Sequence, residues 1–159
     1  VDLIAVVAAV IEISHSRAQT EGVALIWSPP EEALMVRGGE VRLQQVVLNL
    51  FSNAMDAMAG QDKAKEVEIA VERDGARVEL RVCDTGPGLV EPDRIFDPFY
   101  STKQLAPDGQ GHDGMGLGLS ISYGLVQSFG GEITGHNREI GGAVFTMILD
   151  AAVTEEEAA

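Results

Sequence analysis

The 159-residue chain has a single cysteine, Cys83, and no hydrophobic run long enough to cross a membrane. One cysteine excludes an internal disulfide and fits a reducing compartment. The longest apolar run, from Leu3 to Ile11, is too short to span a bilayer. It also lacks the basic start and the cleavage pattern of a signal peptide. Because the first residue is Val1, we expect the chain to be a piece of a longer protein.

Basic residues are also scarce, since 11 Lys and Arg stand against 25 Asp and Glu, giving a formal net charge of −14. Such a surface repels nucleic acid and anionic lipid, so we expect no direct contact with either. An acidic protein still binds an anionic nucleotide when a metal and a few local basic groups offset the repulsion. With no repeat and no linker, residues 1–150 are predicted to form one domain, and residues 151–159 a flexible acidic tail.

The pattern of apolar residues predicts three helices, over 2–19, 41–58 and 117–129. Alternation and turn residues predict short strands over 23–27, 34–36, 132–135 and 143–150, and a hairpin of 66–72 with 78–82 around Asp74-Gly75. This order favours an α/β (α+β) two-layer sandwich. We expect a mixed, mostly antiparallel sheet of about five strands, covered on one face by three helices.

The predicted helix 41–58 carries an unusual polar face. Placed at 100° per residue, one narrow arc holds Gln45, Asn49, Ser52, Asn53 and Asp56. The opposite side is apolar and holds Leu43, Val46, Val47, Leu50, Phe51, Ala54, Ala57 and Met58. An Asn inside a helix costs about 0.5 kcal/mol relative to Ala, so two of them one turn apart indicate that the amides are used. Carboxamide oxygens ligate hard cations, and amide N–H groups bind phosphates.

A second motif, Asp84-Thr85-Gly86-Pro87-Gly88, follows the predicted strand 78–82. A carboxylate at the end of a strand can accept a hydrogen bond from the amino group of a base, and the glycines let another group approach the backbone. The same residues also fit an ordinary type I or II turn with Asp at its first position.

A third motif, DGMGLGLS over residues 113–120, leads into the last predicted helix. Free N–H groups and the helix dipole at such an N-terminus favour phosphate, although a flexible linker is the alternative interpretation. No GK[ST] follows, which excludes a Walker loop. Gly109, Gly111 and Gly114 match G-x-G-x-x-G, but no strand precedes them, which excludes a dinucleotide fingerprint.

The fourth motif is IFDPFYSTK over residues 95–103. Phe96 and Phe99 are spaced as core anchors of a loop. Lys103 stands in a stretch poor in basic residues, where it is either a phosphate partner or a solvated lysine. A loop as long as 84–115 is usually a lid, a binding loop or a disordered segment.

In this order, the four motifs resemble the ATP-binding catalytic domain of sensor histidine kinases, which has the Bergerat fold shared with gyrase-type and heat-shock chaperone ATPases. The resemblance extends from the first helix to Asp150, and FDPFYSTK and GLGLSISYGLVQSFGG look most like the nitrogen-regulation and dicarboxylate-sensor branch. It implies a protein-histidine kinase that binds Mg-ATP and transfers the γ-phosphate to a histidine on a separate dimerisation domain. A response regulator receiver domain would be the further partner, and the location would be cytoplasmic, including the cytoplasmic part of a membrane-bound sensor.

The resemblance also implies roles for single residues. Asn53 would ligate Mg²⁺, Asn49 would support the metal or the phosphates, and Asp84 would accept from the adenine amino group. Asn49, Asn53 and Lys103 are the predicted catalytic residues. The other predicted ATP-binding residues are Asp56, Gly86, Gly88, Phe96, Phe99, Gly114, Met115, Gly116, Leu117 and Gly118. Gyrase-type relatives have a Glu at the position of Asn49 that activates water, which an amide cannot do as a general base.

Three departures from the family pattern qualify this picture. Many members have Lys and Tyr where this chain has Asp56 and Ala57, so Lys103 is expected to supply the missing charge. Many also have Thr where this chain has Ala143, which puts that contact with adenine in doubt. The acceptor histidine motif is absent, since the chain's histidines are expected on the surface of a helix, a lid and a hairpin turn: His15, His112 and His136.

Two other functions fit the same motifs. The chain would be a regulatory module if it bound nucleotide without phosphotransfer, which a supplied helix-pair acceptor domain would reveal. It would be a gyrase-type ATPase if it hydrolysed ATP steadily. Because dimerisation in this family depends on the missing helices, we expect a monomer.

Overall fold

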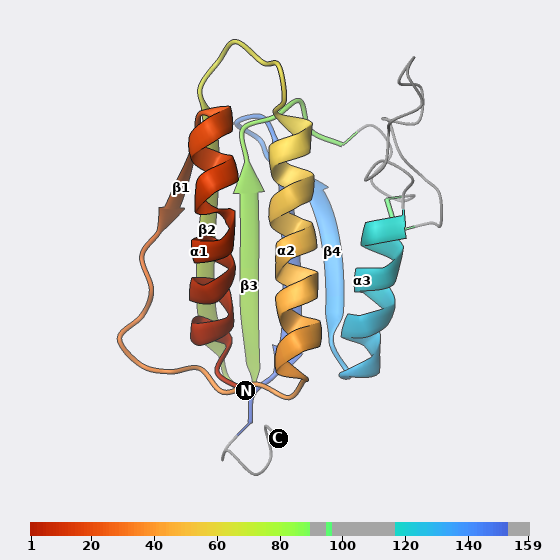
Figure 1. The fold of residues 1–159 in the computed structure, drawn as a ribbon. Helices are drawn as coiled ribbons and strands as arrows, with labels where there is room; N and C mark the ends of the chain where they lie inside the picture. The colour runs from red at the N-terminus through yellow and green to blue at the C-terminus, as the bar shows by residue number, and fades with distance from the viewer. Residues whose placement is uncertain (90–94, 97–116, 153–159) are drawn as a thin grey trace.

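The computed structural model describes residues 1–89, 95–96 and 117–152 (Figure 1). These residues form three helices and five strands in the order α1, β1, α2, β2, β3, α3, β4, β5. The helices are α1 (Leu3–Glu21), α2 (Glu40–Ala57) and α3 (Leu117–Ser128). The strands are β1 (Val23–Trp27), β2 (Lys65–Asp74), β3 (Arg77–Asp84), β4 (Glu132–Asn137) and β5 (Ala143–Asp150).

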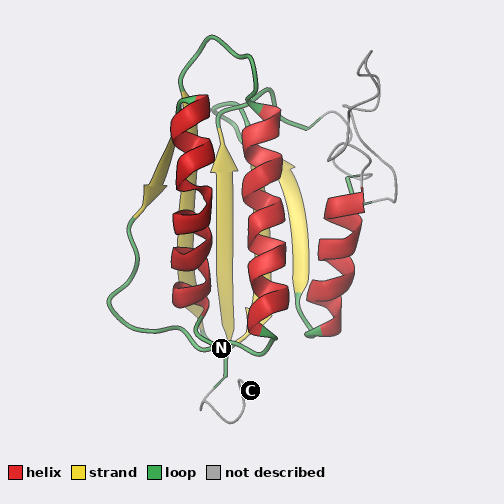
Figure 2. Ribbon diagram, viewed as in Figure 1, coloured by secondary structure: helices red, strands yellow, loops and turns green. Residues whose placement is uncertain are grey.

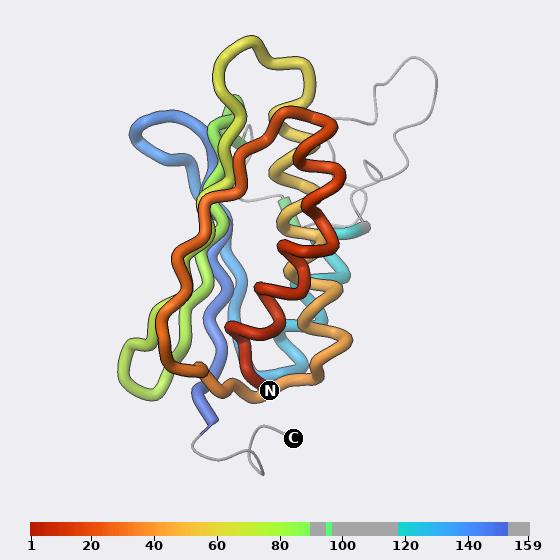
Figure 3. The backbone as a smooth tube through the Cα atoms, turned by 60° about the vertical axis from the view of Figure 1, so that its left-hand side comes forward, coloured from red at the N-terminus to blue at the C-terminus, as the bar shows by residue number. Residues whose placement is uncertain are grey.

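The strands form one sheet in the order β1-β2-β3-β5-β4. Strand β1 pairs with β2 in parallel, and the other neighbours are antiparallel. The three helices lie side by side on one face of this sheet (Figures 1 and 2), and the turned view separates the helix layer from the sheet layer (Figure 3). The predicted two-layer sandwich with a mixed, mostly antiparallel sheet is confirmed.

The core lies between these two layers. On the strands, every second residue is buried, as the period of two requires: Val67, Ile69 and Val71 on β2, Val78, Leu80 and Val82 on β3, and Phe145, Met147 and Leu149 on β5. The central helix α2 buries the predicted apolar stripe, with two differences: Met55 is buried and Ala57 is only half-buried. Because α2 packs against both α1 and α3 as well as the sheet, its buried face is wider on one side than its sequence pattern indicates.

The predicted strand over 34–36 does not form. Met35 makes an isolated bridge to Asp2, and Val36 makes one to Ala151. The side chain of Asp2 accepts from the N–H groups of Ile4 and Leu34, so it both caps α1 and holds the segment that contains Leu34. The segment therefore pairs with residues near both ends of the domain and not with a strand of the sheet.

Three predicted boundaries depend on glycine or on strand pairing. Helix α1 ends at Gly22 in the left-handed conformation, as expected of a C-terminal cap. The β2–β3 hairpin turns at Gly75 with Asp74 paired to Arg77. Strand β4 is longer than predicted because its pairing with β5 continues to Asn137 and Ala143, which places His136 on a strand and not in a turn.

Beyond β5, the backbone stays attached to the body of the domain for two residues. The N–H of Ala151 donates to the carbonyl of Ala76, and the N–H of Ala152 donates to that of Met35. In the part of the chain that the structure describes, no helix is long and apolar enough to cross a membrane.

Candidate functional site

Asp84 ends strand β3, and its side chain is buried, with 1% of its surface exposed. Its Oδ1 accepts from the backbone N–H groups of Gly86 (2.9 Å) and Ala143 (3.2 Å). Among the described residues, Oδ2 takes part in no hydrogen bond. The carboxylate is therefore fixed through one oxygen, while the other remains available for a donor on a ligand.

Burial raises the pKa of the Asp84 carboxyl above its ordinary value, because it removes water from the charged form. The N–H groups of Gly86 and Ala143 and the positive charge of Arg138 act in the opposite direction without cancelling the effect. The ionised carboxylate therefore lowers the free energy of unfolding. A polar group kept buried against its solvation preference is a recognised sign of a functional site.

The hairpin between β4 and β5 presses closely on Asp84. Gly142 has φ +90°, and a Cβ there would lie 2.0 Å from the carbonyl oxygen of Asp84. A Cβ on Gly86 would lie 3.1 Å from Asp84 Oδ1 and 3.4 Å from the carbonyl oxygen of Ala57. Gly142 was not among the predicted site residues, although its place immediately before Ala143 at the start of β5 was a usable signal.

We expect Gly142→Ala to cost at least about 2 kcal/mol more of unfolding free energy than Gly141→Ala. Both glycines have positive φ, so both variants incur about 1–2 kcal/mol of backbone strain. Only at Gly142 does the new Cβ collide with backbone, because nothing lies within 4 Å of the Cβ position of Gly141. Urea denaturation of the two variants measures the difference, and equal losses would contradict the close approach to Asp84.

A second set of contacts holds the backbone around Asp84 from β4. The side chain of Asn137 brackets Leu89, since its Oδ1 accepts from the Leu89 N–H (2.6 Å) and its Nδ2 donates to the Leu89 carbonyl (3.1 Å). Gly88, with φ +91°, leaves room for this amide. Arg138 Nη1 donates to the carbonyl of Asp84 (2.9 Å). Neither Asn137 nor Arg138 was predicted, because their contacts depend on sheet pairing between distant segments.

The polar arc of α2 faces different neighbours along its width. Asn49 Nδ2 donates to Ser122 Oγ (3.0 Å) and to the carbonyl of Gly118 (3.4 Å), both on α3. Gly118 faces Asn49, whose amide carbon would lie 3.9 Å from a Cβ there. On the α1 side of the arc, Ser52 and Asp56 accept hydrogen bonds from Arg17. Asn53, which lies beyond Asn49 at the edge of the arc away from Ser52 and Asp56, makes no hydrogen bond with any described residue, so its amide is available to a ligand.

The donor set on α2 suits a hard cation bound together with an anionic ligand. No group of three or more His, Cys, Asp or Glu side chains in the described ranges is arranged to hold a metal by itself. The carboxamide oxygen of Asn53 is a neutral ligand of the kind that Mg²⁺ accepts when phosphate oxygens and water complete its octahedron. The residues present therefore fit magnesium bound through a nucleotide.

Phe96 lies against α3, with its ring centroid 5.2 Å from that of Tyr123 and the rings tilted by 32°. The neighbouring Ile95 is buried over Gly135, where any side chain on β4 would collide with it. Leu117 is the first residue of α3. Five predicted site residues lie outside the described residues, as does His112: Phe99, Lys103, Gly114, Met115 and Gly116.

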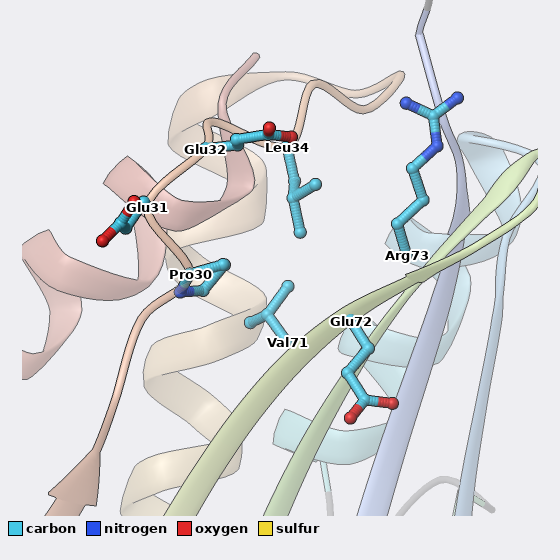
Figure 4. A pocket seen from close by; sticks show the side chains of 7 residues that line it. All are labelled: Pro30, Glu31, Glu32, Leu34, Val71, Glu72 and Arg73. Atoms are coloured by element: carbon cyan, nitrogen blue, oxygen red, sulfur yellow. The ribbon is translucent and has the colours of Figure 1, made fainter.

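A separate pocket lies between the segment that follows β1 and the C-terminal part of β2 (Figure 4). Its lining combines apolar Pro30, Leu34 and Val71 with Glu31, Glu32, Glu72 and Arg73. Val71 pairs with Leu80 and Arg73 with Val78, so the pocket lies toward the opposite end of the β2–β3 hairpin from Asp84. Three glutamates and one arginine would repel a polyphosphate, which argues against nucleotide binding there.

Comparison with known proteins gives one family and one fold. Residues 38–153 match the family model described as histidine kinase-, DNA gyrase B- and HSP90-like ATPase. The two-component sensor PprA of Pseudomonas aeruginosa is 39% identical over 134 residues, which are 80% of this chain and 14% of PprA. The chain thus spans about one seventh of the length of that relative.

Two solved structures share the fold over nearly the whole chain. The catalytic domain of histidine kinase ThkA in a nucleotide-free form superposes with a TM-score of 0.78 at 28% identity, covering 94% of each chain. Full-length ShkA in complex with AMPPNP superposes with a TM-score of 0.74 at 31% identity, covering 97% of this chain and 31% of ShkA.

Proposed function

Because this chain belongs to the family of histidine kinase-, DNA gyrase B- and HSP90-like ATPases, we propose that it is the ATP-binding catalytic domain of a two-component sensor histidine kinase. Its relatives are sensor proteins, and its structural neighbours are histidine kinase catalytic domains. The observation that carries the proposal is the buried carboxylate of Asp84, which keeps one oxygen available at the end of β3.

In this proposal, Asp84 recognises the adenine. Its Oδ1 is occupied by two backbone N–H groups, so Oδ2 accepts from the exocyclic amino group of the base. Gly86 and Gly88 form the floor of the base pocket and let the ring approach the backbone. Ala143 contributes its backbone N–H to Asp84, but its methyl group cannot make the contact with adenine that a threonine makes at this position in many family members.

The phosphates would extend toward the polar arc of α2 and the N-terminus of α3. Asn53 would hold Mg²⁺, which neutralises part of the phosphate charge when bound. Asn49 is kept in place by Ser122 and Gly118, so it positions the start of α3 relative to α2. We assign phosphate contacts to Lys103, Gly114, Met115, Gly116, Leu117 and Gly118, base or lid contacts to Phe96 and Phe99, and a place at the edge of the phosphate site, without contact to the metal, to Asp56.

The chemistry proposed is transfer and not hydrolysis. An amide at position 49 cannot take a proton from water, so nothing at this position activates water against the γ-phosphate. The acceptor would be a histidine on a separate dimerisation domain of the parent chain, followed by a response regulator. The histidine kinase ThkA has been solved in complex with response regulator protein TrrA, and this chain superposes on ThkA in that structure with a TM-score of 0.77 at 25% identity.

A cytoplasmic location and membership of the nitrogen-regulation or dicarboxylate-sensor branch belong to the same proposal.

The test is label transfer from ATP carrying a radioactive γ-phosphate to a supplied dimerisation helix pair of a sensor histidine kinase. We expect an acid-labile label on the acceptor histidine, and no label when that histidine is replaced by Gln. Nucleotide binding without label on the acceptor would favour the regulatory module. Steady release of inorganic phosphate by the 159-residue chain alone would favour the gyrase-type ATPase.

A further inference from the structure

Arg17, on the helix before the nucleotide face, connects α1 to the polar arc of α2. Its Nη1 donates to Ser52 Oγ (2.9 Å), its Nη2 to Asp56 Oδ1, and its Nε to Glu21, one turn later on α1. A guanidinium offers its donors in a rigid plane, so one side chain fixes three acceptors at once. No sequence pattern singles out Arg17, because its partners on α2 are 35 and 39 positions away.

The two α2 partners of Arg17 are near neighbours of the proposed metal ligand, Asn53, along the helix. Ser52 directly precedes Asn53, and Asp56 lies three positions after it, about 5–6 Å away between Cβ atoms on a helix surface. The Asp56 side chain is 18% exposed and that of Arg17 is 35% exposed, so the pair is partly shielded from water. Its charges are therefore screened less than those of an ordinary surface pair.

An acidic residue at this place is costly for a site that binds a polyphosphate. Asp56 stands where many family members have a lysine, so the side chain that would attract phosphate is replaced by one that repels it. Burial alone lowers the pKa of the Arg17 guanidinium, but its hydrogen bonds to Glu21 and Asp56 outweigh burial and raise the pKa overall. The bond to the carboxylate thus favours the charged form of the guanidinium.

We propose that Arg17 is a positioning residue for the nucleotide face of α2: it fixes Ser52 and Asp56, which precede and follow Asn53 along the chain, and compensates the charge of Asp56. This inference rests on the proposed function, since it assumes that the phosphates and Mg²⁺ lie beside Asn53. With Arg17 in place, α2 offers the phosphates neutral amides and a compensated carboxylate. Without it, the carboxylate loses the guanidinium that offsets its charge and repels the phosphates more strongly.

The test compares ATP and adenosine binding to Arg17→Met by calorimetry in magnesium. We expect ATP affinity to fall about tenfold, because Asp56 loses the guanidinium that offsets its charge, and like charges at this separation repel in a partly shielded site. Adenosine, which has no phosphate, should lose less than about twofold in affinity. Arg17→Lys should recover part of the ATP affinity, since a lysine pairs with Asp56 but does not hold three acceptors.

The decisive variant is the double mutant Arg17→Met with Asp56→Asn. Removing the carboxylate should return ATP affinity to within about threefold of the wild-type value, because the repulsive charge is gone. A merely structural role predicts the opposite. The double mutant would then lose at least as much ATP affinity as Arg17→Met alone, and adenosine affinity would fall as much as ATP affinity.

Arg77→Met is the matched control. Arg77 is paired with Asp150 at the start of β3, the opposite end of that strand from Asp84, and its removal changes the net charge equally. Three results would overturn the inference while leaving nucleotide binding intact. ATP affinity could be unchanged in Arg17→Met, it could fall equally in Arg77→Met, or it could fail to recover in the double mutant. Failure of the wild-type chain to bind ATP would instead overturn the proposed function, and this inference with it.

Discussion

Asp84→Asn is expected to weaken ATP and ADP binding by about 1.5–3 kcal/mol, or roughly 10- to 150-fold. The asparagine keeps an oxygen for the N–H groups of Gly86 and Ala143. Its other atom is then an amino group, which faces the amino group of adenine with a donor where an acceptor is needed. Calorimetric titration of the variant and the wild type in magnesium measures the loss, and wild-type affinity in the variant would disprove the assignment of adenine to Asp84.

The same substitution is expected to stabilise the protein without nucleotide. Because the pKa of Asp84 is raised in the folded state, its contribution to stability is fully present below the unfolded-state pKa and is lost as the pH rises through the folded-state value. At neutral pH, the ionised carboxylate therefore lowers the free energy of unfolding, and a neutral isostere removes this cost. Asp84→Asn should melt at a higher temperature than the wild type at pH 7, and the difference should shrink in acid.

Asp74→Asn serves as the control for both effects. Asp74 ends β2 at the exposed hairpin turn, far along the hairpin from Asp84. It should change neither nucleotide affinity nor the pH dependence of the melting temperature. A lower melting temperature for Asp84→Asn at pH 7 would show that the carboxylate stabilises the fold, contrary to the effect of its burial.

Asn53→Ala is expected to abolish the dependence of ATP binding on magnesium. The wild type should bind ATP more tightly in magnesium than in EDTA, because the amide oxygen helps to hold the metal against the phosphates. The variant should bind with the same low affinity in both conditions, close to that of the wild type in EDTA. Paired titrations in magnesium and in EDTA measure this directly.

Gln45→Ala provides a matched change on the same arc of α2. Gln45 lies two turns before Asn53 and is exposed, so losing its amide should leave the magnesium effect intact. A magnesium effect that survives in Asn53→Ala, or that disappears in Gln45→Ala as well, would remove Asn53 from the metal site.

Much of the fold could be predicted from the sequence because its signals are local. The left-handed stop at Gly22, the turn at Gly75 and the alternation on β2 and β3 each depend on residues close to one another in the chain. The short segment 34–36 was assigned wrongly, because whether three extended residues join a sheet depends on a free edge and not on their composition. The wider buried face of α2 likewise reflects its central place between two helices.

In the candidate site too, residues in local motifs could be predicted, and residues whose contacts join distant segments could not. Asn49, Asn53 and Asp84 could be proposed from the sequence because each belongs to a motif with its own spacing. Gly142, Asn137 and Arg138 were not predicted, since the contacts of the β4–β5 hairpin with the end of β3 and the segment after it join residues 48 to 59 positions apart. Such contacts are set by strand pairing, and no local pattern records them.

The most direct test of the account is a calorimetric titration of ATP and ADP into the 159-residue chain, once with magnesium and once with EDTA. We expect both nucleotides to bind, more tightly with magnesium, and one nucleotide per chain. No binding at millimolar nucleotide in either condition would contradict the assignment of Asp84 and the α2 amides to an ATP site.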